Sequence, residues 1–97
     1  MDINIQAIKF DATEKLQNFI NKRIGKLSKF YEGITNVDVS LKVIKPETAA
    51  NKEVSIKVTA PHIELFASKI ADSFEDATDL CAEAIQKQLA KAKEKNQ

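Results

Sequence analysis

Apolar and polar residues alternate along four stretches of the chain, the pattern of a strand with one buried face. The first stretch is 2–10, and a fourth follows Pro61 at 62–68. Between them, two stretches lie on either side of a polar connection at 45–52. Their inward positions are Val37, Val39, Leu41 and Val43, then Val54, Ile56 and Val58. These two stretches predict an antiparallel hairpin that is apolar on one face.

A first helix is predicted between the first and second strands. Apolar residues recur every three or four positions there and form one stripe, with Phe19, Ile20, Leu27 and Phe30 among its members, from Leu16 to Tyr31. Asp11, three residues before Glu14, is expected to cap its start. Gly33 is expected to end it, because glycine adopts the left-handed conformation without strain.

A second, longer helix is predicted at the C-terminal end. Its apolar stripe runs from Phe74 to Ala92, and neither Gly nor Pro interrupts the chain after Ser73. Ser73 precedes Asp76 by three residues, which predicts another cap. The resulting order is β-α-β-β-β-α. It is satisfied by an α+β fold in which both helices pack on one face of a four-stranded, mainly antiparallel sheet.

Length and composition agree with one folded domain over residues 1–97. The chain is 43% hydrophobic and 30% charged, as in ordinary globular proteins. No apolar run approaches the ~20 residues of a membrane span, and the N-terminus lacks the pattern of a signal peptide. A cytoplasmic location is therefore expected. Cys81 is the single cysteine, so no internal disulfide is possible.

The sequence offers little catalytic chemistry. His62 is the single histidine and has no second ligand at metal-binding spacing. Cys81 is in step with Ala77 and Ile85 and is expected to be a small core residue. The glycine spacings of a phosphate-binding loop are absent. We therefore expect no enzyme activity, no metal, no cofactor and no small-molecule substrate.

Charge is distributed unevenly along the second helix. Residues 72–83 carry five acids and no base, whereas residues 84–97 carry four lysines and one glutamate. Acids at a helix start and bases at its end complement the helix dipole, which accounts for Lys93 and Lys95. Lys87 lies too far from the end for this explanation. The acids Glu75, Asp76, Asp79 and Glu83 are expected to form a solvated face.

The first helix carries a basic ridge that the dipole does not explain. Lys15, Lys22, Lys26 and Lys29 are separated by seven, four and three residues, and no acid lies between Glu14 and Glu32. This ridge lies about 120° around the helix from the apolar stripe. Arg23 falls within the stripe, and we expect its stem to lie on the apolar surface while its guanidinium reaches past the edge.

Two helices with basic ridges suit a polyanion such as RNA, whose phosphates lysines contact without reading sequence. Ordinary solvated helix faces remain an alternative. Membrane binding is not favoured, because the tail places few large apolar residues opposite its lysines. A protein-interaction module that uses the acidic half of the last helix is the second functional hypothesis.

The chain resembles the bacterial ribosome hibernation-promoting factors, the short relatives of ribosome-associated inhibitor A, also classed as sigma-factor modulation proteins. The resemblance is carried by LQNFINKRIGKLSKFYEGI (16–34), the hairpin VDVSLKV…EVSIKV and QKQLAKAKEK (86–95). It includes the pattern basic-Leu-x-x-aromatic, met by Lys26, Leu27, Phe30 and Tyr31.

The resemblance implies a double-stranded-RNA-binding-like fold. It also implies binding to the small ribosomal subunit and its rRNA, in the channel of messenger and transfer RNA, which would inhibit translation in starved or stationary cells. The rRNA-binding residues carried over from the family are Lys22, Arg23, Lys26, Lys29, Lys87, Lys91 and Lys95.

Two features differ from the family pattern. Glu75 stands where many members have a tyrosine at the start of the last helix. Long members carry a second domain that pairs two ribosomes, and this chain ends at Gln97. Ribosome dimerisation is therefore expected to need another factor or contacts between ribosomes.

Overall fold

The computed structural model describes residues 1–44 and 50–95, with Lys95 described by its backbone alone. The elements follow the expected order, with one short 3₁₀ helix (η1) added after the first α-helix. They are β1 (Asp2–Ala7), α1 (Glu14–Gly25), η1 (Lys26–Lys29), β2 (Asn36–Val43), β3 (Lys52–Ala60), β4 (Ile63–Ala71) and α2 (Phe74–Lys95).

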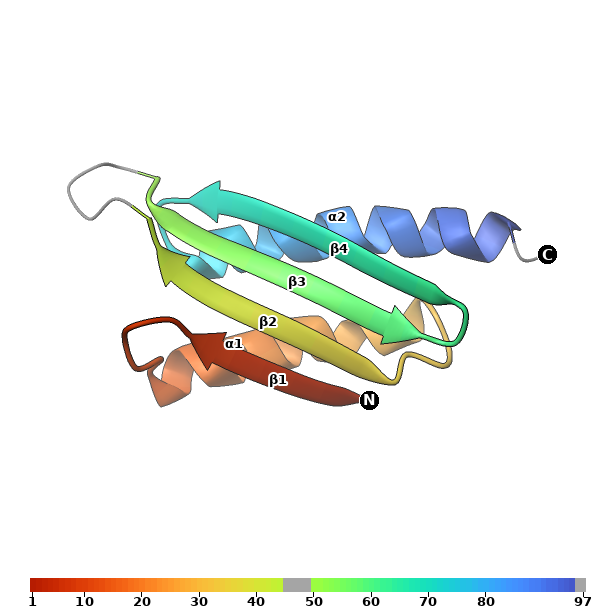
Figure 1. The fold of residues 1–97 in the computed structure, drawn as a ribbon, viewed down its shortest axis with the longest axis horizontal. Helices are drawn as coiled ribbons and strands as arrows, with labels where there is room; N and C mark the ends of the chain where they lie inside the picture. The colour runs from red at the N-terminus through yellow and green to blue at the C-terminus, as the bar shows by residue number, and fades with distance from the viewer. Residues whose placement is uncertain (45–49, 96–97) are drawn as a thin grey trace.

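The strands form one sheet in the order β1-β2-β3-β4, and both helices cover the same face of it (Figure 1). β1 pairs with β2 in parallel, and the other neighbours are antiparallel. The register places Val39 opposite Ile56 and Ile56 opposite Ala67, so inward residues of adjacent strands line up. The predicted α+β fold with a mainly antiparallel sheet is confirmed.

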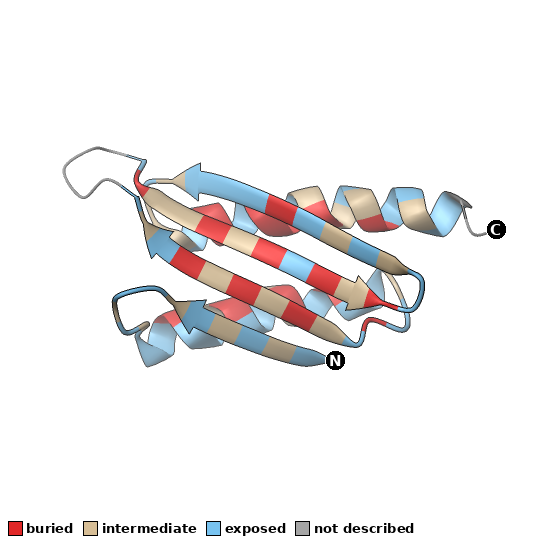
Figure 2. Cartoon of the chain, in the orientation of Figure 1, coloured by how far each residue is buried: buried red, intermediate tan, exposed pale blue. Residues whose placement is uncertain are grey.

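The core lies between the sheet and the two helices. Buried and less buried residues alternate along β2 and β3, as a sheet with one covered face requires (Figure 2). The helices contribute fully buried residues that fill the space above it: Ile20, Ile24, Leu27, Ile85 and Leu89. In the part of the chain that the structure describes, no helix lies on the opposite face of the sheet (Figure 1).

The two helix starts differ in how well they were predicted. Ser73 Oγ accepts a hydrogen bond from Asp76 N at 3.1 Å, so the predicted cap of α2 is confirmed. The predicted cap of α1 is wrong, because Thr13 Oγ1, rather than Asp11, accepts from Leu16 N at 3.1 Å. The first strand also ends earlier than predicted, at Ala7.

The first helix is shorter than its apolar spacing predicts. α1 ends at Gly25, and η1 continues it in the tighter 3₁₀ geometry. Phe30, which follows η1, does not join the buried stripe as predicted and is 47% exposed. Gly33 does have a left-handed φ of +92°, but its predicted role as the helix stop is wrong, because Lys26 caps the end of α1 and Phe30 caps the end of η1. β4 reaches Ala71, three residues beyond the predicted stretch, and residues 45–49 of the predicted connection lie outside the described residues.

Candidate nucleic-acid interface

The lysine ridge of the first helix lies on the outer surface of the helical layer. Lys22 belongs to the last turn of α1, and Lys26 and Lys29 belong to η1. All three are exposed, because the opposite side of the segment carries the buried residues Ile24 and Leu27. Within the described residues none of the three lysines takes part in an ion pair. Their charges are therefore available to a partner.

Arg23 does not project freely past the edge of the apolar stripe. Its Nε donates to Asp79 Oδ1 on α2 at 3.1 Å, and the Arg23 side chain is only 22% exposed. This ion pair joins the two helices, and it also corrects the expectation that Asp79 belongs to a purely solvated face. Arg23 could bind a phosphate through its remaining guanidinium N–H groups or by exchanging partners.

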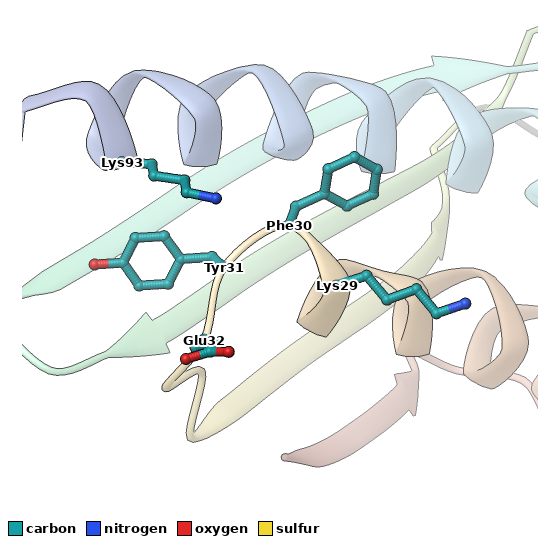
Figure 3. A pocket seen from close by; sticks show the side chains of 5 residues that line it. All are labelled: Lys29, Phe30, Tyr31, Glu32 and Lys93. Carbon is teal, nitrogen blue, oxygen red and sulfur yellow. The ribbon is translucent and has the colours of Figure 1, made fainter.

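A pocket of about 380 Å³ lies where η1 and the residues after it face the C-terminal half of α2. Its lining residues are Lys29, Phe30, Tyr31, Glu32 and Lys93 (Figure 3). Lys93 follows Asp79 by about four helical turns and so lies on the same side of α2, the side that faces α1. Lys29 of η1 and Lys93 of α2 therefore line the same pocket, although the side chain of Lys29 is directed away from Lys93 (Figure 3).

Lys93 was not among the residues expected from the sequence to bind RNA, although it lines the inter-helix pocket. Lys29, which lines the same pocket, is far from Lys93 in the sequence. The angular position of Lys93 around α2 could have indicated its place in the pocket. That inference requires knowing which side of α2 faces α1.

Lys87 lies on a different side of α2 from Lys93. Together with Lys69, Leu80 and Glu83 it lines a separate pocket beside β4. Its Nζ lies 3.6 Å from Glu83 Oε1, an exposed pair one turn apart that is worth only about 0.3–0.5 kcal/mol. Lys91 is exposed one turn further along, and the side chain of Lys95 lies outside the described residues. Lys87 and Lys91 thus lie on other sides of α2 from Lys93 and do not line the inter-helix pocket.

Acidic residues gather around the start of α2, away from the lysines at its C-terminal end. Asp72, Asp76 and Asp79 border a pocket of about 390 Å³ with the exposed side chain of Leu80. Two of these acids already have partners: Asp72 Oδ1 accepts from Ala50 N at 2.7 Å, and Asp79 pairs with Arg23. This leaves fewer free carboxylates for a partner protein than the sequence suggested.

The surroundings of His62 and Cys81, the two residues with possible catalytic chemistry, do not suit a catalytic role. His62 is exposed in the turn between β3 and β4, with φ +69°. Cys81 is fully buried, and its Sγ donates to Ala67 O at 3.2 Å. Burial raises the pKa of Cys81 to about 11, so it is a protonated thiol at neutral pH. Among the described residues no group of three potential ligands could bind a metal ion.

No helix in the described part of the chain combines the length and the apolar character needed to cross a lipid bilayer. The fold and its surface define a small α+β protein whose helical layer carries exposed lysines on one side of a mixed sheet.

Comparison with known families identifies that class. Residues 3–97 match the family described as Sigma 54 modulation protein / S30EA ribosomal protein, and the chain belongs to this family.

Several relatives extend over nearly the whole chain. A ribosome hibernation promoting factor of Azotobacter vinelandii is 30% identical over 100 residues, covering 98% of this chain and 85% of the relative. A protein of the same name from Pseudomonas putida is 28% identical over 97 residues, covering 100% of this chain and 91% of the relative.

Two solved structures share the fold. A ribosomal subunit interface protein from Coxiella burnetii superposes with a TM-score of 0.85 at 22% identity, covering 96% of this chain and 98% of that chain. The N-terminal domain of Thermus thermophilus Protein Y gives a TM-score of 0.80 at 16% identity, covering 94% and 98%.

Proposed function

We propose that this protein is a ribosome hibernation factor that binds the small ribosomal subunit through its helical layer. The observation that carries the proposal is the set of lysines on α1 and η1, which are exposed and have no ion-pair partner among the described residues. Membership of the family and the name shared by its relatives point to the ribosome as the partner.

The proposed mechanism is occupancy. Residues 1–97 act as one domain that lies in the decoding channel of the small subunit in the cytoplasm, where messenger and transfer RNA would otherwise bind. No bond is broken. Lysines act as point charges on rRNA phosphates and release counterions on binding, which gives affinity without sequence readout. Translation in starved or stationary cells stops because the channel is filled.

The proposed contact residues form two groups. Lys22, Lys26 and Lys29 on α1 and η1 are the first. Lys87, Lys91 and Lys95 on α2 are the second. Of these, Lys87 lies in the pocket beside β4 and has to leave Glu83 to contact RNA. Arg23 joins the first group only to the extent that rRNA phosphates compete with Asp79 for its guanidinium.

Binding and inhibition can be tested with purified protein and ribosomes. In sucrose gradients the protein should sediment with small subunits at low salt and leave them at high salt. Messenger and transfer RNA bound in advance should compete with it, and added protein should inhibit a cell-free translation reaction. Failure to sediment with small subunits at any salt concentration would refute the proposal. Sedimentation without competition would refute the location in the decoding channel.

The alternative, a protein-interaction module, rests on the acidic pocket at the start of α2. It predicts a complex with another protein that is lost when Asp76 is changed to Asn, while binding to small subunits is unchanged. Since Asp72 and Asp79 are already occupied, this alternative has less support from the contacts.

A further inference from the structure

One exposed aromatic residue stands among the lysines of the helical layer. Phe30 is 47% exposed and lines the pocket between η1 and α2 with Lys29 on one side of it in sequence and Lys93 across from it (Figure 3). An exposed phenylalanine loses the free energy that burial of its ring would contribute. Packing in the core therefore does not explain why an aromatic residue, Phe30, occupies this position of the basic-Leu-x-x-aromatic pattern.

The backbone around Phe30 is held firmly while its ring faces solvent. Phe30 N donates to Leu27 O at 3.0 Å, and Leu27 is fully buried in the core. Phe30 follows directly on η1, where the chain has already left α-helical geometry. A ring on such a support needs little ordering when a ligand stacks on it, because its backbone is already fixed.

The surroundings of the ring define the ligand. Every nucleobase has a flat π face that stacks on aromatic side chains, and each base in RNA is flanked by phosphates. Lys29 and Lys93 line the same pocket as the ring and supply its positive charge, and the pocket of about 380 Å³ provides a concave space. Bases within a duplex are stacked on each other, so a base that reaches this ring must come from a single-stranded loop, bulge or end.

The carboxylate of Glu32 also lines the pocket, and it sets the polarity of the site. A phosphate is repelled by Glu32 and attracted by the two lysines, so the base and its flanking phosphates have a preferred direction across the pocket.

We propose that this pocket binds one unstacked base of single-stranded rRNA, with Phe30 as the stacking surface and with Lys29 and Lys93 on the adjacent phosphates. The proposal rests on the proposed ribosome binding and specifies the kind of rRNA element that the protein contacts. Phe30 supplies a contact that salt does not screen, whereas the lysines supply the part of the affinity that falls with salt.

The test compares Phe30→Leu with Phe66→Leu. Phe66 is a good control because it is 60% exposed on β4 and, next to the inward Ala67, points to the sheet face opposite the two described α-helices. Loss of one base stack is expected to weaken binding of Phe30→Leu to purified small subunits by about 5- to 150-fold. The slope of log affinity against log salt should stay unchanged, and Phe66→Leu should bind like the unmodified protein. Phe30→Tyr, which keeps an aromatic ring, should restore binding.

A second measurement reports stacking directly. A single-stranded RNA oligonucleotide that contains 2-aminopurine should lose fluorescence on binding to the unmodified protein and to Phe30→Tyr, and lose much less with Phe30→Leu. The same oligonucleotide annealed into a duplex should show no such difference. Lys93→Gln should instead reduce the salt slope by about one unit if it contacts one phosphate.

The outcomes separate this inference from the proposed function. If the unmodified protein binds small subunits and Phe30→Leu binds equally well, the base site is refuted while ribosome binding stands. Equal losses in Phe30→Leu and Phe66→Leu would also refute it, as would failure of Phe30→Tyr to restore binding. If the unmodified protein does not bind small subunits, the proposed function fails, and absence of quenching of the oligonucleotide would then refute the base site as well.

Discussion

The ion pair between Arg23 and Asp79 yields a prediction about stability that bears on RNA binding. The two changes are Arg23→Gln and Asp79→Asn, made singly and together. Their coupling isolates the pair from the other effects of each substitution. The pair joins α1 to α2, so breaking it is expected to loosen the contact between the helices without exposing the core.

The magnitude follows from distance and exposure. At 3.1 Å two unit charges attract by about 1 kcal/mol in water, and holding both side chains in place consumes part of this. The side chains are 22% and 53% exposed, so the environment is neither dry nor fully solvated. We expect a coupling free energy of about 0.2–1 kcal/mol at low salt, declining at 1 M salt. For a chain of this length 1 kcal/mol corresponds to a Tm change of about 4–8 °C.

Urea unfolding of the four proteins at low and high salt measures the coupling. A coupling above about 3 kcal/mol would contradict the reasoning, since only a desolvated pair reaches that size. Zero coupling at low salt would contradict it in the other direction and would show that Arg23 is free in solution. With the predicted coupling, Asp79→Asn should strengthen binding to small subunits, because Arg23 no longer has to leave a partner.

Three further predictions concern stability. Thr13→Ala should lower the free energy of unfolding by about 1 kcal/mol, while Asp11→Ala should leave it nearly unchanged, because Thr13 Oγ1 makes the cap hydrogen bond; urea unfolding of both variants checks this, and the reverse order would contradict it. Leu89→Ala should cost about 2–5 kcal/mol and Leu80→Ala much less, because Leu89 is fully buried and Leu80 is 47% exposed on the same helix; equal losses in thermal unfolding would contradict the placement of α2. The pKa of Cys81 is raised by burial from 9.0 to about 11, so the folded state keeps a proton that the unfolded state releases. The stability contribution of this thiol is therefore complete below pH 9 and lost as pH rises toward 11, and the unmodified protein should lose more stability over this range than Cys81→Ala does; equal pH profiles would contradict it.

The strands and the covered face of the sheet could be predicted from the sequence, because in a half-buried strand only one set of alternate residues can face the core. Shifting the register by one residue would expose every member of the Val37 and Val39 series, so the alternation determines which face is inward. The length of α2 was equally accessible, because no Gly or Pro interrupts it and Ser73 marks its start.

The end of α1 was not predictable in the same way. A 3₁₀ segment keeps side chains three residues apart on one side, so the spacing of Leu27 and Phe30 fits either helix type. The helix type can be told only from the folded structure, in which Leu27 is buried against the core and Phe30 is exposed. The competing caps at Asp11 and Thr13 are likewise close in sequence, and the backbone turn before the helix decides between them.

The candidate site was predicted in its parts but not in its arrangement. The ridge of α1 and η1 is exposed as helical phase requires. The partner of Arg23, in contrast, lies 56 residues away, and the pocket that unites Lys29 with Lys93 depends on how the two helices face each other. Such contacts follow from tertiary packing and have no signature in local spacing.

The function proposed for this protein depends on the lysines of α1 and η1 binding rRNA phosphates. The direct measurement is the salt dependence of binding to purified small subunits for a variant with Lys22, Lys26 and Lys29 changed to Gln. The matched control changes three lysines elsewhere, with the same loss of net charge: Lys9, Lys42 and Lys57. We predict that the first variant binds more weakly, with a slope of log affinity against log salt shallower by about two to three units, and that the control keeps the original slope. Equal slopes for the two variants would contradict the account, because they would show that charge in general, rather than this surface, holds the protein to the ribosome.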